Sequence, residues 1–218
     1  ESGKTLLHAQ GVDVVFDGMA SFGPDDVAAL TSADANVVVS WGGLAAARRF
    51  ASGAGIPFVA GVPFDERSAR GIAERIRRLV DAEPPDAGSV SLDEASACSN
   101  PRILLVGDQV VMGSLRCALL GAEDSLSHED VAVATFFSQD RALALAGDRV
   151  FAEDADLERC LRCDPDLLVV GDPLLRRLPS TKGRLVEMVH PAVSGWLFDE
   201  VKANRKGLLN EIRLRAGA

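Results

Sequence analysis

The chain twice runs from a short apolar stretch into Gly-Asp, in Arg102-Ile103-Leu104-Leu105-Val106-Gly107-Asp108 and in Asp166-Leu167-Leu168-Val169-Val170-Gly171-Asp172. Both stretches are rich in branched side chains and lack polar alternation. This pattern is typical of strands buried on both faces, as in a parallel sheet covered by helices. Gly-Asp then falls at the carboxyl end of each strand, where open α/β sheets bind their ligands.

The segments around these two strands alternate between expected strands and expected helices. Further strands are expected at 12–16, 36–40, 56–60, 131–136 and 185–189. Helices are expected from Pro24 onward and at 42–51, 68–80, 110–120, 139–146, 156–162 and 202–215. Such alternation favours parallel pairing. We therefore predict an α/β fold with two Rossmann-like parallel-sheet domains and a C-terminal helix that bridges them.

The boundary between the two domains is predicted at 83–100. This stretch contains Glu83-Pro84-Pro85-Asp86-Ala87-Gly88-Ser89, which is too rich in Pro, Gly and small polar residues to join a packed element. The first α/β domain then covers 1–82. The second covers 101–218 and includes the C-terminal helix.

Composition excludes some classes of function. Of the 218 residues, 47% are hydrophobic and 25% are charged, which is ordinary for a soluble protein with a core. The net charge of −9 argues against nucleic acid as a partner, because phosphate binding needs clustered Lys and Arg. No apolar run approaches the ~20 residues that span a bilayer, so we expect no membrane partner. Glu1–Gln10 lacks the apolar core of a signal peptide, and we expect a cytoplasmic protein.

The four cysteines are predicted to be free thiols, and no residue is predicted to bind a metal directly. Cys160 and Cys163 form a single C-x-x-C late on an expected helix. A zinc or redox site is typically built from a second pair or from a helix N-terminus, so we interpret this pair as ordinary packing. Cys117 is expected in the core. Cys98 falls in the predicted linker.

Ser40-Trp41-Gly42-Gly43 is the first candidate for chemistry, because a serine at a strand-to-helix turn resembles a nucleophile elbow. Asp172 and His190 follow in the serine, acid, histidine order of α/β-hydrolases. Val38, however, stands where that turn needs its first glycine. The main interpretation is a tight turn whose backbone N–H groups, at Gly42 and Gly43, bind an anion at a helix start.

Gly107-Asp108 is the second candidate, because it follows a strand and opens a helix as a dinucleotide loop does. The G-x-G-x-x-G spacing is absent. Helix capping is the main interpretation of Asp108 and Asp172, with ligand contact as the alternative. His190 directly follows the strand expected at 185–189. A structural role is the main interpretation, and a position that faces the cleft between the domains is the alternative. The candidate cofactor-binding residues are therefore Ser40, Gly42, Gly43, Asp108, Asp172 and His190, and the catalytic residues stay unknown.

Taken in order, six segments resemble the nitrogenase component 1 family, which includes nitrogenase molybdenum–iron subunits, cofactor-assembly scaffolds and dark-operative protochlorophyllide reductase subunits. The segments are 17–30, 33–40, 55–64, 102–120, 156–175 and 187–198, and the expected helix at 202–212 follows. Individually the motifs are loose, and their order carries the resemblance. One departure is Asp65, which stands where the family usually has glycine.

The resemblance implies a component of an oxidoreductase complex with a related subunit, as a homo- or hetero-oligomer, and an ATP-dependent reductase partner. It implies an iron–sulfur or related metallocofactor in the full complex. We match none of the four cysteines, and no segment, to the family's amino-terminal cluster-binding domain, so the cluster ligands are expected from elsewhere. The alternative is a non-catalytic scaffold that binds a metallocofactor or a tetrapyrrole-like ligand. A remote alternative is a serine hydrolase that uses Ser40.

Overall fold

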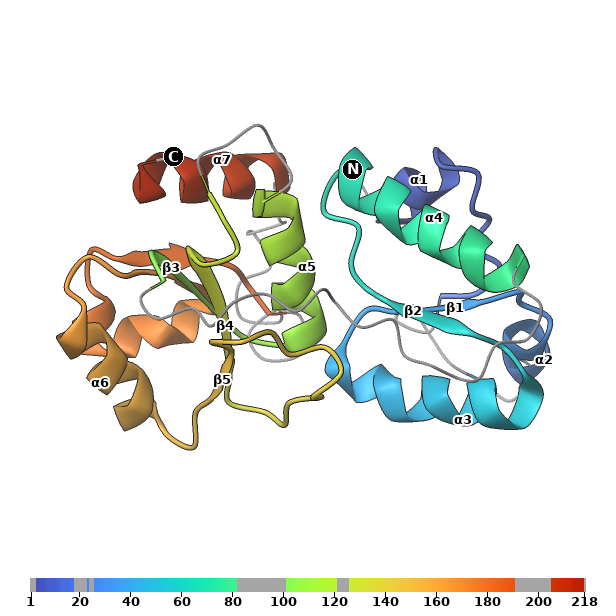
Figure 1. Ribbon diagram of the computed structural model, residues 1–218, viewed down its shortest axis with the longest axis horizontal. Coiled ribbons are helices and arrows are strands. Elements are labelled where there is room, and N and C mark those ends of the chain that lie inside the picture. The colour runs from blue at the N-terminus through green and yellow to red at the C-terminus, as the bar shows by residue number, and fades with distance from the viewer. Residues whose placement is uncertain are drawn as a thin grey trace. The chain divides into compact units, whose positions relative to one another are not determined.

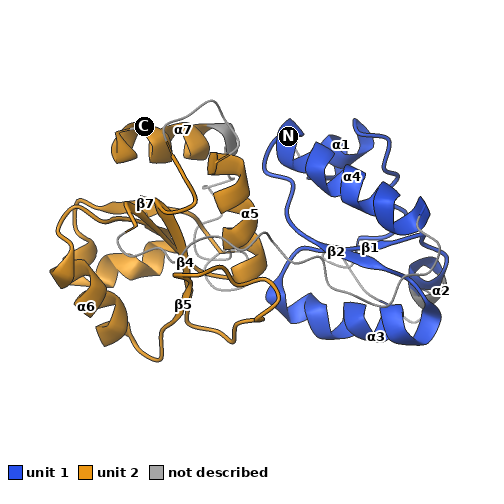
Figure 2. Ribbon diagram, viewed as in Figure 1, with its two compact units in different colours: residues 1–90 blue, residues 91–218 orange. Residues whose placement is uncertain are grey.

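The structure is a computed structural model that describes residues 3–17, 23, 26–81, 101–120, 126–190 and 205–217. The chain forms two compact units, 1–90 and 91–218 (Figure 2). Each unit is α/β and contains a parallel sheet, as predicted. The predicted linker at 83–100, and with it Cys98, lies outside the described residues.

The sheet of unit 2 has five parallel strands in the order β5-β4-β3-β6-β7 (Figure 1). The strands are β3 (Ile103–Val106), β4 (Val131–Thr135), β5 (Arg149–Val150), β6 (Leu168–Gly171) and β7 (Leu185–Glu187). β3 and β6 are the two strands that the repeated pattern predicted, and they pair directly. Every residue of both strands is buried, which explains why neither shows polar alternation.

The two Gly-Asp pairs are offset by one residue in the sheet. Val106 lies opposite Gly171. Gly107 and Asp172 are therefore opposite each other, and Asp108 lies one residue further along. Gly171 is needed where it stands, because a Cβ there would lie 2.9 Å from the carbonyl oxygen of Val106.

Helices cover both faces of this sheet. On one face, buried side chains of β3, β4 and β6 pack with those of α6 (Asp154–Cys163); the cluster includes Leu104, Val106, Ala132, Ala134, Leu157, Leu161 and Val169. Alternate residues of the same strands point to the other face. There α5 (Gln109–Leu120) contacts β3 and β4, and α7 (Arg205–Ala216) contacts α5, β6 and β7.

The helix predicted at 139–146 is wrong: this segment consists of turns and irregular backbone. The Gln109 side chain, which is 3% exposed, donates to the carbonyl oxygen of Asp140 at 2.9 Å and accepts from the Asp140 N–H at 2.7 Å. The N–H of Leu145 donates to Oδ2 of Asp148 at 2.9 Å. Buried side chains thus bond the backbone groups that a helix would pair internally, and β5 follows where no strand was predicted.

A buried ion pair fixes the same segment to α5 and to the sheet. Nη1 of Arg116 lies 2.6 Å from Oδ1 of Asp148, and the two side chains are 3% and 1% exposed. Oδ1 also accepts from the N–H of Val133 at 2.9 Å. This carboxylate therefore satisfies a β4 donor just before β5 begins to pair, and a buried N–H without a partner would be costly.

Unit 1 is smaller and contains the parallel pair β1 (Asn36–Val38) and β2 (Phe58–Ala60). In Figure 1, α1 (Gly3–His8) and α4 (Glu66–Asp81) lie on one side of the pair and α3 (Leu44–Ala54) on the other. A short helix, α2 (Asp26–Thr31), precedes β1. The core includes Leu6, Leu7, Val59, Ala69 and Ile72.

The strand predicted at 12–16 is wrong, because 12–17 has no regular structure. Gly11, with φ 75°, turns the chain back after α1, and the N–H of Val12 donates to the carbonyl oxygen of Leu7 at 3.1 Å. Val12 packs against the core, whereas Val15 is 63% exposed. The β-branched side chains of this segment therefore do not form a strand. The backbone and side chain of Val12 instead close the turn that follows α1.

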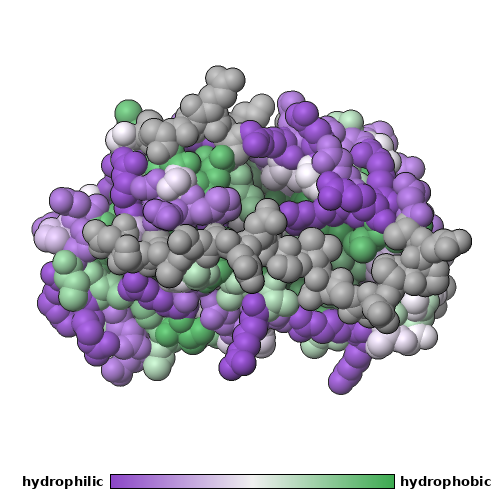
Figure 3. Space-filling view, in the orientation of Figure 1, coloured by the Kyte–Doolittle hydropathy of each residue, from purple (hydrophilic) through white to green (hydrophobic). Residues whose placement is uncertain are grey.

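Within the described ranges, the helices lack the combination of length and apolar character that crossing a bilayer requires. Hydrophilic side chains cover much of the described surface on the face that Figure 3 shows, with apolar side chains between them.

We predict that Gly171→Ala lowers the free energy of unfolding by about 1–3 kcal/mol, because its Cβ would press on a backbone oxygen that cannot move alone. Gly113→Ala, on α5 with nothing within 4 Å of the added Cβ, is the matched control. It should raise the same free energy by about 0.5–1 kcal/mol, because alanine favours helix. Urea unfolding measures both, and equal effects would contradict the register of β3 and β6.

We predict that Asp148→Ala lowers the free energy of unfolding by about 3–5 kcal/mol, because it leaves the buried Arg116 guanidinium without its carboxylate. The control is Glu158→Ala, which breaks an exposed pair with Arg162 on α6 and should cost less than about 1 kcal/mol. Chemical denaturation followed by circular dichroism gives both values. A loss for Asp148→Ala no greater than that of the control would exclude a buried pair.

Candidate functional site

The carboxyl ends of β3 and β6 form the topological switch point of unit 2. From β3 the chain continues to β4 and β5 on one side, and from β6 it continues to β7 on the other. Crevices at such a reversal are where open α/β sheets bind ligands. Asp108 and Asp172, two of the predicted site residues, directly follow these strands.

Asp108 caps α5. Its Oδ1 accepts from the N–H groups of Val110 and Val111 at 2.9 and 3.2 Å, and the residue is 7% exposed. The capping interpretation of Asp108 is therefore confirmed. Gly107 is tightly enclosed, since a Cβ there would lie 2.5 Å from Cε of Met112.

Asp172 joins two segments that leave neighbouring strands. Its Oδ1 accepts from the N–H of Leu174 at 2.9 Å and so caps the short 3-10 helix η2 (Pro173–Arg177). Its Oδ2 accepts from the N–H of His190 at 3.0 Å. Capping is confirmed here too, and the same carboxylate holds the backbone beyond β7, which ends at Glu187 rather than at the predicted 189.

Phe137 is a site residue that the sequence analysis missed. It follows β4, its N–H donates to Oγ1 of Thr135 at 3.0 Å, and it is 46% exposed. Its ring centroid lies 6.3 Å from that of His190, with an interplanar angle of 38°. Phe137 directly follows the strand predicted at 131–136, and no local pattern marks it as a site residue.

The contact between Phe137 and His190 spans the switch point. The two residues follow β4 and β7, which are separated in the sheet by β3 and β6. At roughly 4.8 Å per strand, β4 and β7 lie about 14 Å apart. Their following segments therefore approach each other beyond the carboxyl ends of β3 and β6. The structure thus brings together Asp172, His190 and Phe137, and Asp108 follows the neighbouring strand β3.

The side chains at the switch point are two carboxylates, an imidazole and a phenyl ring. Both carboxylates bind backbone N–H groups, and an exposed aromatic ring lies beside an imidazole. Within the described part of the chain, no group of three or more His, Cys, Asp or Glu side chains could hold a metal ion.

Ser40, Gly42 and Gly43 lie in unit 1, at the carboxyl end of β1. Ser40 precedes the 3-10 turn η1 (Trp41–Gly43), which continues into α3, so the predicted tight strand-to-helix turn is present. A Cβ at Gly43 would lie 3.1 Å from Cγ1 of Val38, so Gly43 lets α3 start close to β1. With φ −150° and ψ 157°, Ser40 has relaxed extended backbone, whereas a nucleophile elbow is a strained turn.

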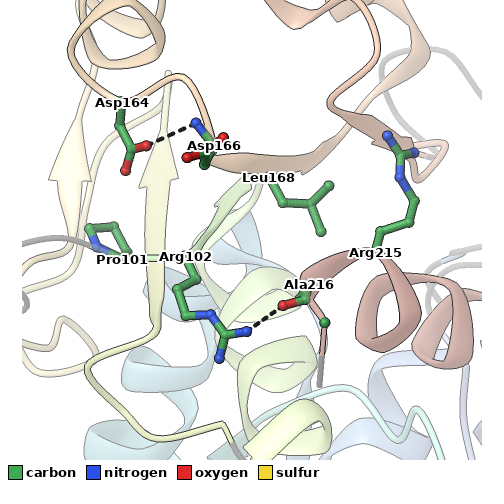
Figure 4. A pocket seen from close by; sticks show the side chains of 8 residues that line it. Pro101, Arg102, Asp164, Asp166, Leu168, Arg215 and Ala216 are labelled. Carbon is green, nitrogen blue, oxygen red and sulfur yellow. Dashed lines mark hydrogen bonds between the residues drawn. The ribbon is translucent and has the colours of Figure 1, made fainter.

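A hollow of about 490 Å³ lies at the opposite, amino end of β3 and β6 (Figure 4). Its two arginines bond to backbone: Arg102 donates to the carbonyl oxygen of Ala216, and Arg215 donates to those of Leu185 and Gly183 at 2.8 and 2.7 Å. Oδ1 of Asp164 accepts from the N–H of Asp166 at 3.0 Å. The bonds of Arg102 and Arg215 tie α7 to the sheet, which gives both arginines a structural role.

The three described cysteines lie away from the switch point. Cys117 is exposed on α5, which corrects the expectation that it is in the core. Cys163 is exposed and Cys160 half-buried at the end of α6, and all three are free thiols. Because α6 leads into β6, its last turn lies at the amino edge of the sheet.

Comparison of the chain with protein family models, curated proteins and solved structures finds no match. The geometry of the two units is therefore the basis for assigning a function.

We predict that Phe137→Leu shifts the ring resonances of one histidine only, because His190 loses the ring current of Phe137. The chain has three histidines, so the imidazole signals are resolved in a proton–carbon NMR spectrum. Asp172→Asn should move the same histidine, because the amide has one acceptor oxygen for the two N–H groups, of Leu174 and His190, that the carboxylate binds. Phe50→Leu, on α3 of unit 1, is the control and should leave this signal in place. Unchanged histidine signals in Phe137→Leu would contradict the site.

Proposed function

We propose that this chain is a nitrogenase component 1-like domain pair that works within a cytoplasmic oxidoreductase complex. In this proposal units 1 and 2 are the two Rossmann-like domains, and α7, which was predicted to bridge them, packs on α5, β6 and β7 of unit 2. A related subunit and an ATP-dependent reductase are the partners. The observation that carries the proposal is the convergence of Asp172, His190 and Phe137 at the switch point of a five-stranded parallel sheet, beside the strand that Asp108 follows.

The strand order supports this assignment. In chain order, the five strands of unit 2 are arranged 3-2-1-4-5, the order of the first five strands of a doubly wound nucleotide-binding sheet. That order places the ligand at the first and fourth strands, which here are β3 and β6. The family resemblance of 102–120 and 156–175 covers both of these strands.

The described residues do not fit an iron–sulfur cluster. Such clusters are held by several thiolates that converge on one point. Here one described cysteine is on α5 and two are on α6, and the carboxyl edge carries carboxylates and aromatic rings instead. The proposal therefore assigns the cluster ligands to another chain or segment. It gives unit 2 the role of binding and orienting a ligand.

Co-purification tests the oxidoreductase proposal. We predict that the protein, expressed from its own gene with the neighbouring genes, elutes as a complex that contains iron and absorbs in the visible range. Phe137→Ala should lower the iron content or the turnover of that complex without dissociating it. Leu214→Ala, on α7 and 80% exposed, is the control. A colourless complex without iron would overturn the proposal.

The second candidate is a non-catalytic scaffold for a metallocofactor or a tetrapyrrole-like ligand. The exposed Phe137 ring beside His190 favours it, because planar ligands stack on such surfaces. A scaffold gains stability from its ligand without turnover, by about 2.7 kcal/mol at 100 times the Kd. In a thermal-shift series with tetrapyrroles, Phe137→Ala should lose this gain and Leu214→Ala should keep it.

The serine hydrolase stays a remote candidate. The relaxed backbone of Ser40 argues against it, and a fluorophosphonate probe decides the matter, because only an activated serine is labelled.

A further inference from the structure

We propose that Cys160 and Cys163 form a reactive dithiol that exchanges with low-molecular-weight disulfides and closes into an intramolecular disulfide at the end of α6. This inference is independent of the proposed function. It rests on the exposure of Cys163, the spacing of Cys163 and the half-buried Cys160 on one helix, and a guanidinium that contacts the sulfur of Cys160.

The first observation concerns the environment of Cys160. Nη1 of Arg149, on β5, donates to its Sγ at 3.1 Å. The guanidinium is a charged donor, so this hydrogen bond is stronger than one between neutral groups and holds the sulfur in place. Arg149 also orients the sulfur on the half-buried side of α6, beside the core that contains Leu157 and Leu161.

The second observation is that Cys163 is exposed one turn further along the same helix face. Residues three apart on a helix have Cβ atoms about 5–6 Å apart, whereas a disulfide needs roughly 3.5–4.5 Å. The remaining 1–2 Å requires adjustment of one turn. α6 ends at Cys163, and Asp164 is already extended with φ −131° and ψ 101°. Formation of the disulfide therefore changes the last turn of α6 and leaves the rest of the helix in place.

The cost of that adjustment is local. The bond from the Asp164 N–H to the carbonyl oxygen of Cys160, 3.1 Å long, is the one that closure would weaken. The Arg184 side chain donates to the carbonyl oxygens of Leu161 and Asp164 at 3.1 and 2.8 Å. It can keep the end of α6 attached while the turn changes.

The reaction has two balanced steps. The thiolate of Cys160 attacks one sulfur of a small disulfide, forming a mixed disulfide and releasing one small thiolate. The thiolate of Cys163 then attacks the Cys160 sulfur and releases the second small thiolate. The protein loses two thiol protons and two electrons, and the small disulfide is reduced to two thiols. No metal or other oxidant takes part.

Oxidised glutathione is the probe for the test. It is applied to the full chain with Cys98→Ser, so that only Cys117, Cys160 and Cys163 can react. Wild-type Cys160 and Cys163 should become linked, seen as a two-hydrogen loss in intact mass and as a cross-linked peptide. Cys163→Ser should accumulate glutathione on Cys160. Cys117, exposed on α5, is the internal reference for an ordinary surface thiol.

The role of Arg149 is tested in the Cys163→Ser background. Arg149→Met should slow glutathionylation of Cys160 roughly tenfold, the effect of losing one charge-assisted hydrogen bond. Arg149→Lys should restore part of the rate. Arg159→Met is the matched control, since Arg159 lies on α6 but pairs with Asp156 at 2.9 Å. The Ala152 N–H, and after it the Arg159 side chain, lowers the pKa of Asp156 by hydrogen bonding to its carboxylate.

Three outcomes would overturn the proposal. One is modification of Cys160 no faster than that of Cys117. Another is the absence of a Cys160–Cys163 link after full oxidation. The third is equal rates in Arg149→Met and Arg159→Met, measured on variants whose circular dichroism matches that of the parent. Arg149→Lys separates loss of charge from loss of folding.

Discussion

Burial of β3 on both faces is the constraint on which unit 2 depends. A strand with no exposed face needs a partner on each side and helices above and below, because its polar backbone must be paired and its side chains covered. β4 and β6 provide the pairing, and α5 and α6 provide the cover. The close contact of Gly171 with Val106 then sets the register. That register determines where Asp108 and Asp172 emerge.

Charged groups inside the unit complete what the short strands leave unpaired. β5 has two residues, so β4 has a backbone donor at Val133 that no strand pairs. Asp148 accepts from it, and Arg116 neutralises that carboxylate within the same buried space. Such a pair is costly to bury, and its hydrogen bonds to backbone offset the cost. The edge of the sheet and the segment that carries Phe137 therefore depend on one another.

Continuous apolar runs predicted β3 and β6 correctly, whereas no local sequence pattern indicated the polar tertiary contacts. β3 and β6 were found because their burial appears in every residue. The helix expected at 139–146 failed because Gln109 and Asp148, from before and after it, bond its backbone. The sequence predicted the positions of Asp108, Asp172 and His190 at the sheet edge, because Gly-Asp or His-Pro directly follows each apolar run. Phe137 was missed because its neighbour His190 is distant in sequence, and only the strand order brings the two together.

The direction of the chain in a parallel α/β unit places its carboxylates and its paired thiols at opposite edges of the sheet. Residues that follow a strand emerge at the carboxyl edge, as Asp108 and Asp172 do. A helix that leads into a strand ends at the amino edge, as α6 does with Cys160 and Cys163. Each strand of four residues spans roughly 13 Å, so these thiols cannot reach a ligand held at the switch point. A metal cluster at the carboxyl edge would need thiolates from another segment or chain. The dithiol of α6 instead changes the end of the helix that Arg184 joins to the start of β7, and β7 leads to His190.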